Sequence, residues 1–125
     1  MPRLTDPDRL AAYRDALRNW NFADYIRFTG KLNEEAYRFV RQILGITEKD
    51  LGRLMYEHVA AGGEIDEVKE TRPEWPEYKF HYDLVLTIRN KLVYIETRFE
   101  LDTHYRLPVV ADEAWIEVVN IHEQR

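Results

Sequence analysis

The candidate catalytic side chains lie in two segments of alternating apolar and polar residues, 80–88 and 92–99. The first segment contains His81, and the second contains Glu96 and Arg98. Histidine changes its charge near neutral pH and can take up and return a proton, whereas arginine stays charged and holds anions through its planar guanidinium. These residue types together are suited to proton transfer on an anionic substrate.

Several kinds of chemistry are excluded by residues that the sequence lacks. It contains neither serine nor cysteine, so serine and cysteine nucleophiles, disulfides and thiolate metal sites are ruled out. The histidines do not follow the spacing of common zinc motifs, and we expect neither a metal site nor a cofactor. They are His58, His81, His104 and His122. What remains is metal-free acid–base chemistry by His, Tyr, Asp or Glu, with Arg holding an anion.

The pairing of the two segments decides which side chains meet. Residues 89–91 form a tight turn, and a two-residue turn is the choice that collects apolar residues on one face of the hairpin. That face carries Phe80, Tyr82, Leu84, Leu86, Ile88, Val93, Ile95, Thr97 and Phe99. On the opposite, more polar face, we expect His81 to oppose Arg98 and Asp83 to lie close to Glu96.

Two interpretations of this polar face stay open. Antiparallel sheets often leave one face in water, where mixed charges are ordinary, so the face is either a solvated surface or a site. Tyr82 also has two interpretations, a core aromatic or a catalytic residue. Its place among the apolar residues is typical of a core aromatic.

The elements that would position this hairpin begin with three helices. We expect helix starts at Thr5 or Asp6 before Pro7, at Asn33, and at Thr47 with Asp50 in a capping box. Glycines at 45 and 62–63 end the second and third helices. The buried face expected for the second helix is Ala36, Tyr37, Phe39, Val40, Ile43 and Leu44. Residues 22–32 are expected to form a short helix or turn.

Strands follow the helices, with a short one at 65–71, the hairpin, and a last one at 115–121. This order predicts an α+β fold in which N-terminal helices pack on one face of a C-terminal antiparallel sheet. We expect a single domain over residues 1–125, with a helical part over about 5–62 and a sheet part over about 63–125.

Composition adds limits on location and partners. The 125 residues are 45% hydrophobic, enough for a core, and no stretch is apolar enough to span a membrane. Without cysteine or a secretory signal, a cytoplasmic location is expected. Residues 1–53 carry 10 Lys and Arg against 8 Asp and Glu, and the rest carry 8 against 15. The net charge of −5 weakens a nucleic-acid interpretation, but a local basic face would still permit it.

Several segments of the chain resemble the MqsR-type mRNA interferase toxins of bacterial toxin–antitoxin pairs. The similar segments are Arg9-Leu10, residues 45–55, Glu67-Val68 followed by Arg72-Pro73, and residues 82–88. The resemblance implies a RelE-like toxin fold and a metal-independent RNA cleavage. Carried over one position at a time, it places the family's catalytic groups at Arg53, Asp66, Tyr82 and Arg98.

The resemblance implies an endoribonuclease that cleaves single-stranded mRNA through attack by the 2′-hydroxyl, leaving a cyclic phosphate. Arg53 and Arg98 would hold the phosphate, His81 or Asp66 would remove the proton, and Tyr82 or protonated His81 would assist the departing oxygen. An antitoxin protein is the implied partner, besides RNA.

The alternative from another class is a non-enzymatic protein-interaction module. It would use the polar sheet face and the loop that contains Trp75 and the two prolines Pro73 and Pro76, together with Trp115.

Overall fold

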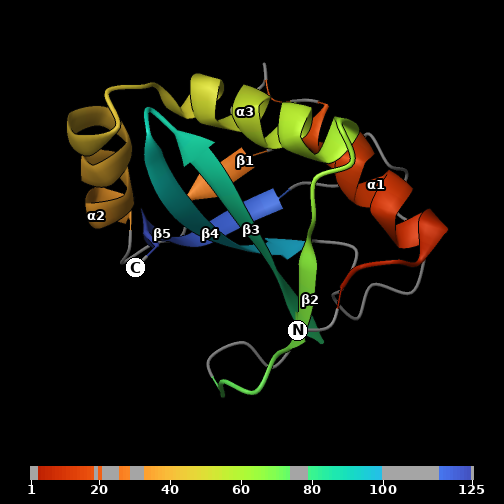
Figure 1. The fold of residues 1–125 in the computed structure, drawn as a ribbon. Coiled ribbons are helices and arrows are strands. Elements are labelled where there is room, and N and C mark those ends of the chain that lie inside the picture. The colour runs from red at the N-terminus through yellow and green to blue at the C-terminus, as the bar shows by residue number, and fades with distance from the viewer. Residues whose placement is uncertain are drawn as a thin grey trace.

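The computed structural model describes residues 3–18, 20, 26–28, 33–73, 79–99 and 116–124. The helices precede the antiparallel strands and contact the sheet, which confirms the α+β arrangement (Figure 1). In chain order the elements are α1 (Pro7–Leu17), β1 (Ile26–Phe28), α2 (Asn33–Arg38), the π-helical segment η3 (Phe39–Ile43), α3 (Glu48–Ala60), β2 (Asp66–Lys69), β3 (Phe80–Ile88), β4 (Lys91–Phe99) and β5 (Ile116–Glu123). Among the described residues, no helix has the length and apolarity needed to cross a membrane.

The sheet has the strand order β1-β5-β4-β3-β2. Strands β2 to β5 pair antiparallel, whereas β1 lies at the edge and pairs parallel to β5. The prediction of a short helix or turn over residues 22–32 is therefore wrong at Ile26–Phe28. A three-residue strand has too few residues to show an alternating pattern, and its pairing depends on a partner about 90 residues further along the chain.

The hairpin register matches the prediction. Thr97 opposes Tyr82 and Glu96 opposes Asp83, around a two-residue turn at Arg89 and Asn90. Both turn residues have positive φ, 51° and 67°, as a type I′ hairpin turn requires. The apolar face expected from this register is buried against the helices, so the other face is the polar one.

Local capping signals are confirmed at two helix starts. The Asp6 carboxylate accepts a hydrogen bond from the Asp8 backbone at the start of α1. Thr47 and Asp50 bond to each other's backbone N–H groups at 3.1 Å, the expected capping box of α3.

The buried face expected for the second helix is only partly correct. Ala36, Val40 and Leu44 are buried, but Tyr37 is 36% exposed and Ile43 is 54% exposed. The wider turn of the π-helical segment η3 explains the difference, because it rotates the apolar stripe away from the spacing of a regular α-helix.

Candidate functional site

The polar face of the sheet carries a row of carboxylates across three strands. Asp66 of β2 opposes Asp83 of β3, and Asp83 opposes Glu96 of β4. Residues directly opposite one another on antiparallel strands point to the same side, so these three acids share one face. Acids this close need cationic or proton-sharing partners to remain together in a folded protein.

His81 is the first such partner. Its Nδ1 lies 2.7 Å from Oδ1 of Asp83, and the side chain is 14% exposed. Burial raises the pKa of Asp83, the hydrogen bond from His81 opposes that rise, and the nearby charge of Glu96 adds to it. A carboxylate that holds Nδ1 fixes the ring orientation and leaves Nε2 as the nitrogen on the opposite side of the ring.

A group of two acids and two arginines lies beside this pair, and we call Glu70, Arg72, Glu96 and Arg98 the ion cluster. Arg98 is completely buried, with its Nη1 2.8 Å from Oε2 of Glu96 and its other terminal nitrogen paired with Glu70. Arg72 pairs with both acids as well, its Nε lying 3.2 Å from Oε1 of Glu70. The Arg72 side chain is 41% exposed, so within the ion cluster it is the guanidinium that a ligand in solution can reach.

The ion cluster shifts the titration of its acids. Burial raises the pKa of Glu96, but hydrogen bonds and charges of Arg72 and Arg98 outweigh that effect and hold the pKa below its ordinary value. The pKa of Glu70 is also below its ordinary value, because hydrogen bonds from the Arg72 backbone and side chain outweigh the effect of burial. Both acids therefore carry a full negative charge at neutral pH.

We expect the free energy of unfolding to decrease as the pH falls below about 4.5, the ordinary value for a glutamate. The pKa values of Glu70 and Glu96 are lower in the folded protein, so the unfolded chain binds more protons and acid favours it. Urea unfolding at a series of pH values measures this loss, and the exposed Glu57→Gln protein provides a control with the same slope as wild type. A free energy of unfolding that stays constant down to about pH 3 would contradict the lowered pKa values of Glu70 and Glu96.

Tyr94 connects the site to the last strand. Its hydroxyl donates to Oε1 of Glu96 at 3.5 Å, and burial together with the charge of Asp83 raises its pKa, so the hydroxyl stays protonated. On its other side, the Tyr94 ring stacks on the His122 ring of β5, with centroids 4.9 Å apart and planes inclined by 28°. His122 thus lies at the margin of the polar face.

The structure brings three of the five predicted site residues to the polar face, namely Asp66, His81 and Arg98. Asp66 is paired with Arg3, whose Nε lies 3.4 Å from Oδ1. Arg98 is where the register predicts it, but it is buried and paired with Glu70 and Glu96, so a phosphate would have to displace these acids to reach it.

Tyr82 points to the opposite face from Arg98. It is fully buried, and its ring lies 5.6 Å from that of Tyr13 and 6.3 Å from that of Phe99, measured between centroids. Its hydroxyl donates to Glu67 at 3.2 Å and also contacts Arg9. The structure therefore places Tyr82 as a core aromatic and does not bring it together with Arg98.

Arg53 is also separated from the site. It lies on α3, whose buried residues pack toward the apolar face of the sheet, whereas Arg98 lies on the other face. Its guanidinium pairs with Glu57 at 3.2 Å and Asp50 at 3.8 Å on the exposed side of the helix. The expected convergence of Arg53 and Arg98 on one phosphate is not found.

We expect the Arg53→Ala protein to keep its stability within about 0.5 kcal/mol, because exposed ion pairs contribute little. Any RNA cleavage should also be unchanged, since this side chain lies away from the polar face. Urea unfolding and an RNA cleavage assay check both statements. A tenfold loss of cleavage in a stably folded Arg53→Ala protein would show that Arg53 takes part in the reaction.

Three of these side chains also form a candidate metal site. Ligand atoms of His81, Asp83 and Glu96 lie within 4.8 Å of one another, and one nitrogen with two carboxylate oxygens suits zinc or manganese. A cation there would have to displace His81 from Asp83 and compete with two arginines for Glu96. The arrangement therefore suits proton transfer better than metal binding.

Asp83, Arg72 and Tyr94 were not among the predicted site residues. Asp83 could have been found, since two residues separated by one position on a strand point to the same side and His81 precedes it by two. No alternation of this kind points to Arg72, because its approach to Glu96 depends on how the chain turns after β2. Of the residues expected to dock a protein partner, Trp75, Pro76 and Trp115 lie outside the described residues.

Fold and site together define an α+β domain with a histidine–carboxylate pair and a buried ion cluster on one face of its sheet. Comparison with protein-family models, with curated proteins and with solved structures finds no match for this chain.

Proposed function

We propose that this chain is a metal-independent endoribonuclease of the toxin type, cleaving single-stranded mRNA in the cytoplasm. The observation that supports this best is the 2.7 Å contact of His81 with Asp83 beside the accessible guanidinium of Arg72. An oriented imidazole can act as the general base, and an arginine can stabilise charge on the phosphate, and both tasks belong to phosphodiester cleavage without a metal.

In the proposed reaction, Nε2 of His81 takes the proton from the 2′-hydroxyl of the RNA. The 2′ oxygen attacks phosphorus and the bond to the 5′ oxygen breaks, which leaves a 2′,3′-cyclic phosphate. The departing 5′ oxygen takes a proton from water, and Asp83 stabilises the imidazolium. Arg72 donates to a non-bridging oxygen and balances the charge that develops there.

Arg72 takes the role that Arg53 and Arg98 have in the family resemblance. Arg98 acts here as a positioning residue, because its ion pair fixes Glu96 next to Asp83. Asp66 does not act as the base in this proposal, since its carboxylate is paired with Arg3.

The formal charge of the site predicts a weak dependence of RNA binding on salt. Within the ion cluster, Arg72 is the guanidinium that a ligand in solution can reach, so about one phosphate contact is expected. For single strands this gives a slope of log K against log salt of about −0.7. Binding of an uncleavable 2′-deoxy oligonucleotide across a salt series measures it, and a slope of −3 or steeper would indicate an extended basic track instead.

Expression in bacteria tests the function. Wild-type protein should arrest growth and fragment mRNA, the His81→Ala protein should do neither, and Arg53→Ala should behave as wild type. Equal toxicity of the wild-type and His81→Ala proteins, without RNA fragmentation, would overturn the proposal. The same resemblance supports a partner antitoxin that covers the polar face, and its co-expression should restore growth.

The interaction module remains the second candidate, favoured by the complete burial and neutralisation of Arg98. Under this alternative the ion cluster serves stability alone. Intact RNA in cells arrested by wild-type protein would support it.

A further inference from the structure

The polar face carries one more negative charge than its arginines balance. The ion cluster contains two acids and two arginines, so its own charges are matched. Asp83 adds a third acid beside it, opposite Glu96 on the neighbouring strand. Within the described part of the chain no arginine pairs with Asp83, whose partners are His81 at 2.7 Å and the Tyr94 hydroxyl. Because Asp83 is buried, this charge favours either a protonated His81 or a bound cation.

Three possible ligand atoms converge at this point. One atom each from His81, Asp83 and Glu96 lies within 4.8 Å of the other two. Ligand atoms about 2.1 Å from a tetrahedral zinc ion lie about 3.4 Å from one another, so rotation of the side chains can bring these three to bonding distance. One imidazole nitrogen and two carboxylate oxygens are a donor set that zinc accepts, with a fourth position left for water.

The competition from the arginines is weakest at one oxygen of Glu96. Arg72 and Arg98 both donate to its Oε2, whereas its Oε1 accepts the 3.5 Å bond from Tyr94. Tyr94 is also hydrogen-bonded to Asp83, so one hydroxyl orients both carboxylates. Carboxylates that bind metals are commonly held by outer hydrogen bonds of this kind. A cation can therefore bind through Oε1 while the arginine contacts to Oε2 stay in place.

A cation on His81 changes which ring nitrogen carries the proton. An ionised Asp83 only accepts hydrogen bonds, so Nδ1 of the neutral ring carries the proton and Nε2 has the lone pair. A cation binds Nδ1 through a lone pair, which leaves the single proton of the neutral ring on Nε2. In that state Nε2 cannot take the proton of a 2′-hydroxyl.

We propose that His81, Asp83 and Glu96 form an inhibitory zinc site, in which the ion binds Nδ1 of His81 and prevents proton transfer at Nε2. The binding of zinc is independent of any activity, whereas the inhibition rests on the proposed ribonuclease function. Without zinc the same groups serve proton transfer, in agreement with the contact between Nδ1 and Asp83. The metal-free reaction and the zinc site are then alternative states of one set of side chains.

Calorimetric titration of the purified, metal-free protein with zinc chloride tests the site directly. We expect one ion per chain and a loss of affinity of about 100-fold or more in both His81→Ala and Asp83→Asn, because a lost ligand costs more than a lost outer partner. Tyr94→Phe removes an outer partner and should lose about 10- to 100-fold. Magnesium chloride should not displace zinc, since magnesium prefers oxygen ligands and retains its waters.

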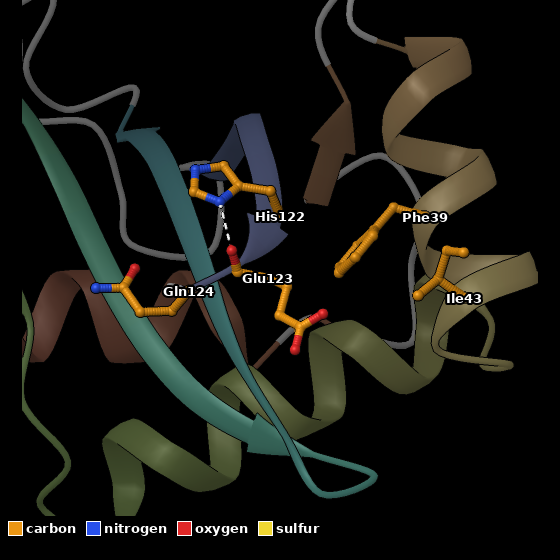
Figure 2. A pocket seen from close by; sticks show the side chains of 5 residues that line it. All are labelled: Phe39, Ile43, His122, Glu123 and Gln124. Carbon is orange, nitrogen blue, oxygen red and sulfur yellow. Dashed lines mark hydrogen bonds between the residues drawn. The ribbon is translucent and has the colours of Figure 1, made fainter.

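His122→Ala is the matched control. Figure 2 shows Nδ1 of His122 directed at the backbone oxygen of Glu123, at a distance of 3.0 Å. The ring stacks on Tyr94, so this variant removes a histidine beside the site and none of the three ligands. It should bind zinc as the wild-type protein does. Equal zinc affinity of the wild-type, His81→Ala and Asp83→Asn proteins, or no binding by wild type, would overturn the site.

Nitrogen-15 NMR of the histidine rings tests how zinc inhibits. In the metal-free protein we expect the ring proton of His81 on Nδ1, and in the zinc-saturated protein on Nε2. The position of the proton is read without RNA, so the result does not depend on activity. A ring proton that stays on Nδ1 when zinc is bound would overturn the proposed ligand.

Cleavage separates failure of the zinc site from failure of the proposed function. If wild-type protein cuts RNA, zinc at its dissociation constant should halve the rate, and excess chelator should restore it. If RNA is cut but zinc neither binds nor slows the reaction, the site is wrong and the ribonuclease function stands. If zinc binds through these ligands but metal-free protein leaves RNA intact, the ribonuclease function is wrong and the zinc site stands. Faster cleavage with zinc would overturn the inhibition.

Discussion

Replacing His81 with alanine is expected to lower the rate of RNA cleavage by about two to four orders of magnitude. The substitution removes the imidazole that takes the 2′-hydroxyl proton and leaves the hairpin register and the ion cluster in place. Single-turnover cleavage of a defined oligonucleotide measures the change, since it reports the chemical step without product release.

Asp83→Asn provides the graded comparison for this prediction. An asparagine still contacts Nδ1 but does not stabilise the imidazolium, so we expect an intermediate rate between wild type and His81→Ala. Arg53→Ala is the matched control for a charged side chain away from the site. Cleavage by His81→Ala within a factor of two of wild type would show that another group removes the proton.

Replacing Arg98 with alanine is expected to cost about 3–5 kcal/mol in the free energy of unfolding. The guanidinium is completely buried, and without it Glu70 and Glu96 lose one of their two cationic partners in the sheet. Urea unfolding measures the effect, which for a domain of this size is a large part of the total stability.

A neutral replacement of the buried charges tests the cause. In a triple variant with Glu70→Gln, Arg98→Met and Glu96→Gln, no buried acid is left unpaired, so much of the lost stability should return. A loss below about 1 kcal/mol in Arg98→Ala would mean that Arg72 alone neutralises both acids. Loss of cleavage in the Arg98→Ala protein would then reflect the positioning of Glu96 and not a contact between Arg98 and RNA.

The hairpin was predictable because local and tertiary signals agree there. Alternating residues define one apolar face, and the turn at Arg89 and Asn90 allows a single register that buries it. The same register places His81, Asp83 and Glu96 on one face before any coordinates are known. Where a short segment pairs with a distant one, as in β1 and β5, the local pattern contains too little information.

The details of the site depended on packing that no spacing reveals. Arg98 was expected to face a substrate, yet it is buried and paired with Glu70 from the chain after β2, an acid that it shares with Arg72. Family resemblance assigned Tyr82 to the reaction, but alternation along β3 already placed it with the core residues. Here the physical pattern predicted the orientation better than the positional carry-over.

The chemistry of the RNA ends produced by purified protein in the presence of a metal chelator tests the central claim most directly. Mass spectrometry of the fragments should find 2′,3′-cyclic phosphates and 5′-hydroxyls with wild-type protein and intact RNA with His81→Ala. Intact RNA with wild-type protein, or fragments that carry 3′-hydroxyl and 5′-phosphate ends, would contradict a metal-independent ribonuclease centred on His81 and Asp83.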